Sequence, residues 1–328
     1  MSKVFPMKTW AAGDAVNAAD INSNFGLSNI FGGLGTDGAL TITSGVTTID
    51  LALATVVEKN YSSISITGTG SLAFSNPNDN GTIIVLKSVG DMTLTSSAAP
   101  MIDVSNCGAK AGAGVTTSGT NGDGTDGTDG YGRPFITNHG VHAYGGAPGI
   151  PGTGGLKTSS SALYRTLSTH LRYYELFVGA GGGGGGTNSG TGSATSGPGG
   201  RGGGCLIIEC GGAWNFTTAN GIKVGGQDGT DGTVPGSNAG AGGGGGGGGG
   251  MLLALYNSLT ANTGTVVVAG GVGGKGTIVG SAHATGAGGG GSFVNDGSTG
   301  TDSTSTGTKT GGDGAPGFSL IQQNTCYS

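Results

Sequence analysis

The chain has 328 residues, of which 79 are glycine, and charged side chains make up only 9% of it. The formal net charge is −5 and the 13 lysine and arginine residues are thinly spread, which argues against binding to nucleic-acid phosphates. No stretch of about 20 consecutive apolar residues is present that would insert into a membrane as a helix. The first residues lack the apolar centre of a signal peptide, so we expect synthesis and assembly in a cytoplasm.

A glycine content this high, without a strict period, often indicates a disordered chain. Disordered chains usually carry many charges, however, and this one carries few. Apolar runs typical of strands also recur between the glycine tracts, as in residues 82–86 and 251–255. We therefore expect an ordered protein in which the glycine tracts are part of the fold.

Residues 1–35 have few glycines and contain a short predicted helix. Asn17 can cap this helix, and Ile21 and Phe25 lie on one of its faces. A helix this short needs a partner to pack against. It is either a local cap on the following domain or, as we expect, a segment for attachment to a virion or for oligomerisation. The candidate attachment residues are Trp10, Asp14, Ile21 and Phe25.

Residues 36–107 are predicted to form a small β domain. Threonine or serine alternates with apolar residues in three segments, which is typical of half-buried strands. These segments are residues 39–43, 63–67 and 91–95. Asn78-Asp79-Asn80-Gly81 is a turn signal before the next apolar run.

An internal repeat extends from this region into residues 108–328. Its three copies open at Gly81, Gly204 and Gly250, and each consists of a strand, a turn, a second strand and a glycine tract. The first copy matches less closely than the other two. The tracts themselves share a Gly-Ala-Gly opening at residues 179, 240 and 286. Such recurrence argues against a random spacer.

Ordering so much glycine requires many compensating backbone hydrogen bonds, because fixing a glycine backbone costs more entropy than fixing any other residue. In polyproline-II geometry the backbone N–H and C=O groups point outward, with three residues per turn. Helices of this kind that lack Cβ atoms could therefore hydrogen-bond to one another. Uninterrupted glycine at 242–250 predicts a central helix of such a lattice. Flexible tethers are the competing interpretation.

Glycine at every third position predicts outer helices of the same lattice, with the other side chains in solvent. This spacing occurs at residues 124–130, 146–152 and 226–232. The predicted fold is therefore mostly β, with little α-helix. Residues 108–328 form a glycine-rich domain of packed polyglycine-II helices flanked by β-strands.

The Gly-Ala-Gly-Gly tracts resemble those of the glycine-rich adhesins at the tips of T-even-type phage long tail fibres, over roughly residues 108–317. Residues 10–14 and 17–25 resemble the N-terminus of many phage tail-fibre and tail-tip proteins. The resemblance implies loops that contact a host surface glycan or outer-membrane protein, and an N-terminal segment bound to other tail proteins. By analogy with fibres it also implies a homotrimer, and a single copy at a tip is the alternative. In the T-even type the adhesin caps a separate fibre, whereas here both features share one chain.

Two stretches rich in tyrosine, arginine and histidine interrupt the glycine. Tyr and Arg are favoured at binding hot spots, and loops on a rigid scaffold commonly carry binding sites. The stretch 157–178 also has leucines at helical spacing, so it is either a packing helix that closes the lattice or a receptor contact. The candidate receptor-binding residues are Tyr164, Arg165, His170, Arg172, Tyr173 and Tyr174, with Tyr131, His139, His142 and Tyr144 in the second stretch.

The remaining motifs predict neither a cofactor nor a metal. Residues 270–277 superficially resemble a phosphate-binding loop, but Gly276 stands where the motif needs Ser or Thr, so we interpret them as a glycine-tract turn. The Asp-Gly repeats lack the spacing of calcium loops and are interpreted as solvated turns. These repeats contain Asp123, Asp126, Asp129, Asp228 and Asp231.

The cysteines and the carboxylates likewise point to a structural protein. Cys107, Cys205, Cys210 and Cys326 lack zinc-site spacing and are expected to be buried reduced thiols. Cys205 and Cys210 should lie on opposite faces of one strand, because they are an odd number of residues apart. A glycan-cleaving enzyme would need a positioned pair of carboxylates, and here carboxylates occur mainly in Asp-Gly repeats.

We therefore expect a tail fibre or adhesin of the virion and not an enzyme. The alternatives are a head fibre or capsid decoration protein, a purely structural fibre spacer, and a cellular glycine-rich adhesin, which should carry an export signal.

Overall fold

The computed structural model describes residues 31–128, 132–133, 176–188, 192–235, 238–280, 284–292, 296–303 and 309–324. Every helix or strand that could be assigned within these ranges is a β-strand, so the described residues contain no helix. This confirms the prediction of a mostly β fold with little α-helix.

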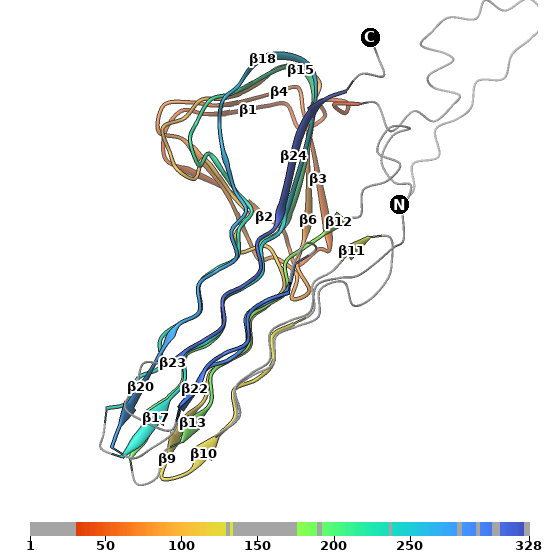
Figure 1. Cartoon of the computed structure of the whole chain (residues 1–328). Helices are drawn as coiled ribbons and strands as arrows, with labels where there is room; N and C mark the ends of the chain where they lie inside the picture. The colour runs from red at the N-terminus through yellow and green to blue at the C-terminus, as the bar shows by residue number, and fades with distance from the viewer. Residues whose placement is uncertain are drawn as a thin grey trace, which may run out of the picture.

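The first strands wind into a three-sided parallel β-solenoid, which Figure 1 shows as a triangle because the view runs along the stack. One turn contains β3 (Val56–Tyr61), β4 (Ser63–Ile66) and β5 (Ser71–Ser75), and the next contains β6 (Ile83–Ser88), β7 (Met92–Leu94) and β8 (Ile102–Asp103). Each strand pairs in parallel with the equivalent strand of the next turn. An incomplete turn of β1 (Ala39–Ile42) and β2 (Val46–Asp50) pairs with β4 and β5.

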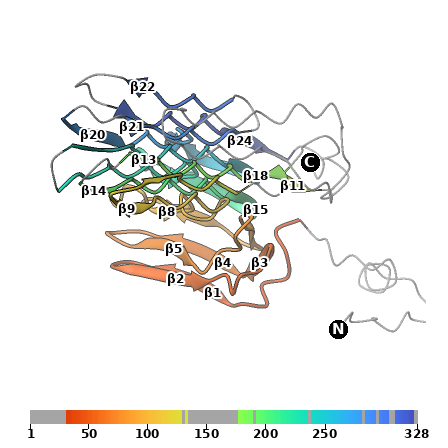
Figure 2. The same ribbon diagram turned by 90° about the horizontal axis from the view of Figure 1, so that it is seen from below.

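The repeats found in the sequence are successive turns of this solenoid. β15 (Cys205–Phe216) bends to pair first with β6 and then with β7, and β16 (Ile222–Lys223) pairs with β8. β18 (Met251–Asn262), β19 (Val266–Val267) and β24 (Phe318–Gln323) extend the stack in the same direction. Figure 2 shows the turns one above another. The same parallel sheets therefore contain strands from both sides of residue 107, where the composition of the sequence changes.

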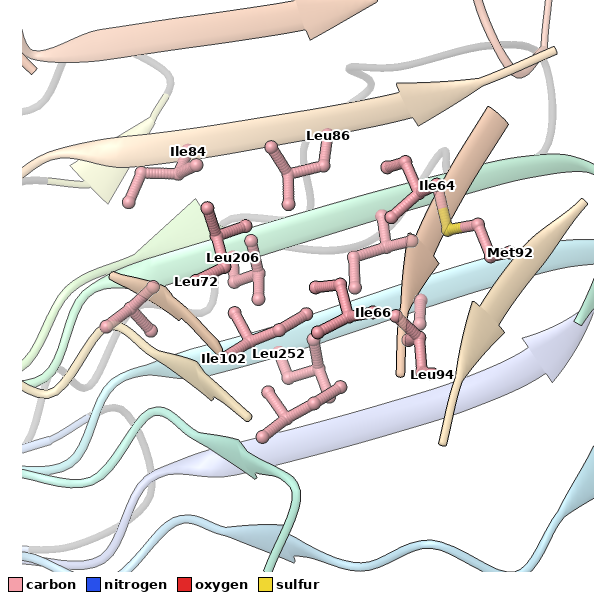
Figure 3. Close-up of a cluster of buried hydrophobic side chains, with 14 of the residues drawn as sticks. Ile64, Ile66, Leu72, Ile84, Leu86, Met92, Leu94, Ile102, Leu206 and Leu252 are labelled. Atoms are coloured by element: carbon pink, nitrogen blue, oxygen red, sulfur yellow. The ribbon is translucent and has the colours of Figure 1, made fainter. Parts of the chain in front are cut away.

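Alternate side chains of the strands fill the interior of the solenoid, as the period-two pattern predicted. Ile66, Leu94, Leu206 and Leu252 are almost fully buried in this core (Figure 3). Trp214 is fully buried in the same core, where its ring makes an aromatic edge contact with Phe216 and stacks on Tyr256. Burying each large apolar side chain contributes about 1.5–3 kcal/mol, so this core is the main source of stability in this part of the molecule.

The first side of the solenoid is apolar on its outer surface as well. Ile83, Cys205 and Met251 point outward from β6, β15 and β18 into a second buried cluster. Leu176, Phe177 and Val178 pack against them. Burial on both faces explains why these strands are continuous apolar runs, whereas the strands of the second side alternate.

After the third side of each later turn, the chain leaves the solenoid in glycine-rich segments that run to a distant end and return (Figure 1). Residues 242–250 lie at the centre of this lattice and all are buried. Their N–H groups donate to three different neighbouring segments in turn: residues 180–186, residues 224–230 and residues 312–315. Their C=O groups accept from three others: residues 197–203, residues 271–274 and residues 287–290.

Six neighbours, each contacted at every third residue, are what a helix with three residues per turn and outward backbone groups requires. Gly242, Gly245 and Gly248, for example, donate to Gly186, Gly183 and Ala180 over 2.9 Å. The predicted lattice of polyglycine-II helices is confirmed, and the tethers considered as an alternative are excluded for these residues.

Glycine is required in the lattice by close approach and not by backbone conformation. The glycines of residues 242–250 have no positive φ. A Cβ atom built on any of residues 243–250, however, would lie closer than 3.0 Å to backbone atoms of a neighbouring segment. Packing at this distance is possible only without side chains.

At the edge of the lattice, side chains accept hydrogen bonds from backbone N–H groups that have no further glycine segment beside them. Gly226, Gly229 and Gly232 face inward as predicted. Asp228 and Asp231 are exposed, as expected for solvated residues, but they lie in an extended lattice segment and not in turns. Asp228 Oδ1 accepts the N–H of Val272 at 2.8 Å, and Asp231 Oδ1 accepts that of Lys275 at 2.6 Å. The two carboxylates thus replace a missing neighbouring segment.

Residues 270–277, which resemble a phosphate-binding loop, also belong to this edge of the lattice. Gly271 and Gly274 donate to Gly247 and Gly244. The residues form an extended lattice segment that enters a strand, and not the turn that we interpreted from the sequence.

We predict that Gly245→Ala destabilises the lattice, because the added Cβ would collide with the carbonyl of Gly288. Overpacking of this kind costs about 1–3 kcal/mol. Amide exchange of residues 242–250 should be slow in the wild type and at least tenfold faster in the variant, which is roughly 1.4 kcal/mol. Thr230→Ala, which changes an exposed side chain of a neighbouring segment, is the control and should leave exchange unchanged. Fast exchange in the wild type would contradict the lattice.

Candidate binding surface at the end of the glycine lattice

The turns that join the glycine segments gather at the end of the lattice far from the solenoid (Figure 1). Strands from different segments pair there in an antiparallel sheet of the order β10-β13-β17-β20-β23. We call this surface the lattice tip. Its strands are β9 (Thr116–Ser118), β10 (Asn121–Gly122), β13 (Thr187–Asn188), β14 (Ser193–Thr195), β17 (Ala239–Ala241), β20 (Lys275–Val279), β21 (Ala284–Thr285), β22 (Asp302–Ser303) and β23 (Lys309–Thr310).

The local sequence explains why the chain reverses its direction at the tip. Gly119 follows β9 with φ of 68°, a conformation that suits the first position of a two-residue hairpin turn. Gly280, which follows β20, has φ of 79°. A Cβ atom at Gly119 would meet nothing within 4 Å, and one at Gly280 would lie 3.0 Å from Asn238. The positive φ is therefore the main reason that these positions require glycine.

Hydrogen bonds between loops hold the tip in one arrangement. The hydroxyl groups of Thr117 and Thr187 are 2.8 Å apart, and those of Thr116 and Thr195 are 3.1 Å apart. Thr195 also exchanges two backbone hydrogen bonds with Thr233. Beneath these bonds Ala194, Ala239 and Ala241 form a small buried cluster. The loops therefore form a preorganised surface.

The exposed side chains of the tip are small and mostly uncharged. They include Ser118, Asn121, Thr195, Thr277 and Val279, with Lys275 as an exposed cation. Hydroxyl and amide groups both donate and accept hydrogen bonds, so this surface suits directional recognition of polar groups. The residues that the structure describes contain no group of three or more His, Cys, Asp or Glu side chains that could bind a metal ion.

The binding and attachment residues predicted from the sequence lie outside the described residues. This applies to Trp10, Asp14, Ile21, Phe25, Tyr131, His139, His142, Tyr144, Tyr164, Arg165, His170, Arg172, Tyr173 and Tyr174. Described residues within the two stretches predicted to bind a receptor meet, because β11 (Gly132–Arg133) pairs with β12 (Leu176–Phe177) next to the solenoid.

Sequence reasoning overlooked the tip, because Thr and Ser in short loops carry no binding signature. A signal was nevertheless present, since short runs of Thr, Ser and Asn interrupt the glycine segments at similar intervals.

An ionic cluster in which Lys87 and Glu209 are buried and Glu58 is partly exposed lies on the first side of the solenoid, near the start of the described chain. Lys87 Nζ is 3.0 Å from Glu58 and 3.9 Å from Glu209. Glu209 Oε2 accepts the N–H of Gly32 at 3.3 Å. Burial raises the pKa of Glu209, although the charge of Lys87 opposes this effect. The cluster thus holds Gly32, at the C-terminal end of the predicted attachment segment, residues 1–35.

We predict that Lys87→Met strongly destabilises the protein at pH 8, by roughly 3–5 kcal/mol, because it leaves Glu209 buried and unpaired. Burial already raises the pKa of Glu209, and the loss of Lys87 removes the charge that opposes this effect. Above the folded-state pKa the variant therefore holds an unpaired buried carboxylate, which lowers its unfolding free energy. Below that pKa the carboxyl is protonated and this destabilisation disappears. The deficit in unfolding free energy should therefore be smaller at pH 5 than at pH 8.

Lys110→Met is the matched control for this prediction. Lys110 forms an ion pair of 3.5 Å with Asp79, and both side chains are mostly exposed. Exposed pairs contribute only about 0–1 kcal/mol. Equal losses in the two variants at pH 8 would contradict the assigned role of the cluster.

Cys107, Cys205 and Cys210 are free and buried, which confirms the prediction for these three, whereas Cys326 lies outside the described residues. Cys205 points into the outer apolar cluster and Cys210 into the solenoid core, so they lie on opposite faces as expected. Burial raises the pKa of Cys107 and Cys205 to about 12 and that of Cys210 to about 11.

We predict that these three thiols do not react in the folded protein at pH 8, because a thiol reacts as its thiolate and their pKa values lie well above this pH. The measurement is colorimetric thiol titration of a Cys326→Ser variant before and after unfolding in guanidinium. All three thiols should appear only after unfolding. Rapid reaction without denaturant would show that at least one site opens.

Comparisons with protein-family models, with curated proteins and with solved structures find no match for this chain. Among the described residues no helix is long and apolar enough to cross a membrane. Functional inference therefore depends on the arrangement of the chain's own residues.

Proposed function

We propose that this chain is a bacteriophage tail fibre or tail-tip adhesin that binds the host cell surface non-covalently. The lattice tip is its binding surface, and residues 1–35 attach it to other tail proteins. The observation that carries the proposal is the gathering of separate polar loops into one hydrogen-bonded surface at the end of a rigid scaffold. Binding residues commonly occupy loops that a rigid scaffold positions.

Preorganisation supports this assignment energetically. A loop that is already ordered loses little conformational entropy on binding, so weak polar contacts can yield net affinity. The tip offers hydroxyl and amide groups that suit a glycan or the exposed loops of an outer-membrane protein. We assign the chain no catalytic step and no cofactor. A homotrimeric assembly in the virion is part of the proposal.

The test is adsorption of the labelled full-length protein to a panel of Gram-negative cells, measured by flow cytometry. Ser118→Arg and Val279→Arg each place a large charged side chain on the tip. We predict that each lowers the apparent affinity at least roughly tenfold, because an unpaired charge in an interface is costly. Thr48→Arg on β2, also an exposed position in a strand, should bind like the wild type.

Two outcomes would contradict the proposal. Unchanged adsorption of both tip variants would place the binding surface elsewhere in the chain. Failure of the wild-type protein to adsorb to any strain of the panel would favour the structural spacer over the adhesin.

A further inference from the structure

The three sides of the solenoid present different chemistry to their surroundings. The first side is covered on its outer surface by apolar residues such as Phe177. The outward positions of the third side include charged residues, among them Asp50, Asp103 and Lys223. The outward positions of the second side, on β1, β4, β7 and the latter part of β15, carry no charge within the strands, and the exposed carboxylate of Asp91 lies directly before β7, between Ser63 and Ala213.

We call the outward residues of the second side the hydroxyl face, because nearly all of them are threonine or serine. The residues that alternate with them along each strand, such as Ile64, Ile66 and Leu94, point into the core. The hydroxyl face comprises Thr41, Thr43, Ser63, Ser65, Thr67, Thr93, Thr95, Ala213, Asn215 and Thr217.

These side chains stand in two straight columns across the stacked strands. In the first column Thr41 is opposite Ser65, Ser65 is opposite Thr93, and Thr93 is opposite Asn215. The second column is formed by Thr43, Thr67, Thr95 and Thr217, whose backbones continue the same ladder. Neighbouring strands are about 4.7–4.9 Å apart, and alternate residues of one strand about 6.6 Å apart, so the face is a regular grid.

The hydroxyl groups of this grid have no side-chain hydrogen-bond partner within the part of the chain that the structure describes. Threonines elsewhere in the protein differ in this respect. Thr116 and Thr195 bond to each other at the lattice tip, and Thr218 donates to the carbonyl of Ser96. Asp91, at the margin of the face, accepts the N–H of Ala213 at 2.8 Å. The grid therefore offers an ordered set of unoccupied donors and acceptors.

We propose that the hydroxyl face binds the flat surface of packed neutral polysaccharide chains. Such a surface is itself a periodic array of hydroxyl groups, each of which donates and accepts, as each Ser and Thr of the face does. An anionic polymer would find no counter-charge there, because the charged side chain beside these residues is the carboxylate of Asp91. Single hydrogen bonds of this kind contribute little net affinity, so a rigid array in register is needed for many to form together.

This site is separate from the lattice tip. The second side lies on the part of the solenoid turned away from the glycine lattice (Figure 1). A glycan on the hydroxyl face would therefore leave the tip accessible, and the protein could contact two surfaces at once. The inference goes beyond the proposed adhesion and does not depend on it.

The test is co-sedimentation of the purified full-length protein with microcrystalline cellulose and with insoluble curdlan, two neutral polysaccharides. Ser65→Lys places a charge at the centre of the grid. It should weaken binding at least roughly tenfold, since an ammonium group without a partner is costly to bury. Ser71→Lys is the matched control, because Ser71 is also a half-buried, outward serine of an internal strand, but on the third side.

A second variant separates hydrogen bonding from shape. Replacing Thr41, Thr93 and Thr95 together by valine keeps the branched side chains and removes only the hydroxyl groups. Binding should fall again, with the thermal midpoint recorded to confirm folding. The proposal is overturned if the wild type binds neither polysaccharide, if Ser65→Lys and Ser71→Lys bind equally, or if the triple valine variant binds like the wild type.

Discussion

Hydrogen bonds between the backbones of neighbouring glycine segments are the interaction on which the rest of the structure depends. Each bond contributes a net of about 0.5–1.5 kcal/mol, whereas fixing the backbone of one residue costs about 1–2 kcal/mol. The two terms are similar, so the lattice gains little stability from any single segment. It becomes stable because residues 242–250 bond to six neighbours at once, and because the solenoid holds both ends of each later excursion.

The solenoid supplies what the lattice lacks, an apolar core with a fixed register. The segments that enter the lattice leave stacked strands such as β16 and β19 and return to stacked strands such as β18 and β24, so neighbouring segments start in alignment. At the junction, Arg201 donates from Nε to the carbonyl of Gly108 at 2.9 Å and from Nη2 to that of Asn78. Order in the core is thereby transmitted to loops at the far end.

The lattice also has to stop growing at its edges, since a row of unpaired N–H groups would attract further chains. Asp228 and Asp231 cover such donors on one outer segment. In another outer segment the exposed Pro198 has no N–H to offer. The two surfaces that we propose for recognition, the lattice tip and the hydroxyl face, differ from these edges because they present ordered polar side chains and not backbone groups.

The sequence by itself determined the local features. Alternation in β4 and β7 identified the buried side of each strand, the parity of Cys205 and Cys210 placed them on opposite faces, and unbroken glycine at 242–250 left only the backbone to bond with. Tertiary structure alone decided which strands stack, where the loops meet and what Asp228 contacts. The physical reason is that a period-two pattern shows which face of a strand is buried but not which other strand it pairs with. One glycine N–H is also chemically identical to any other, so only the anchoring solenoid selects which carbonyl it meets.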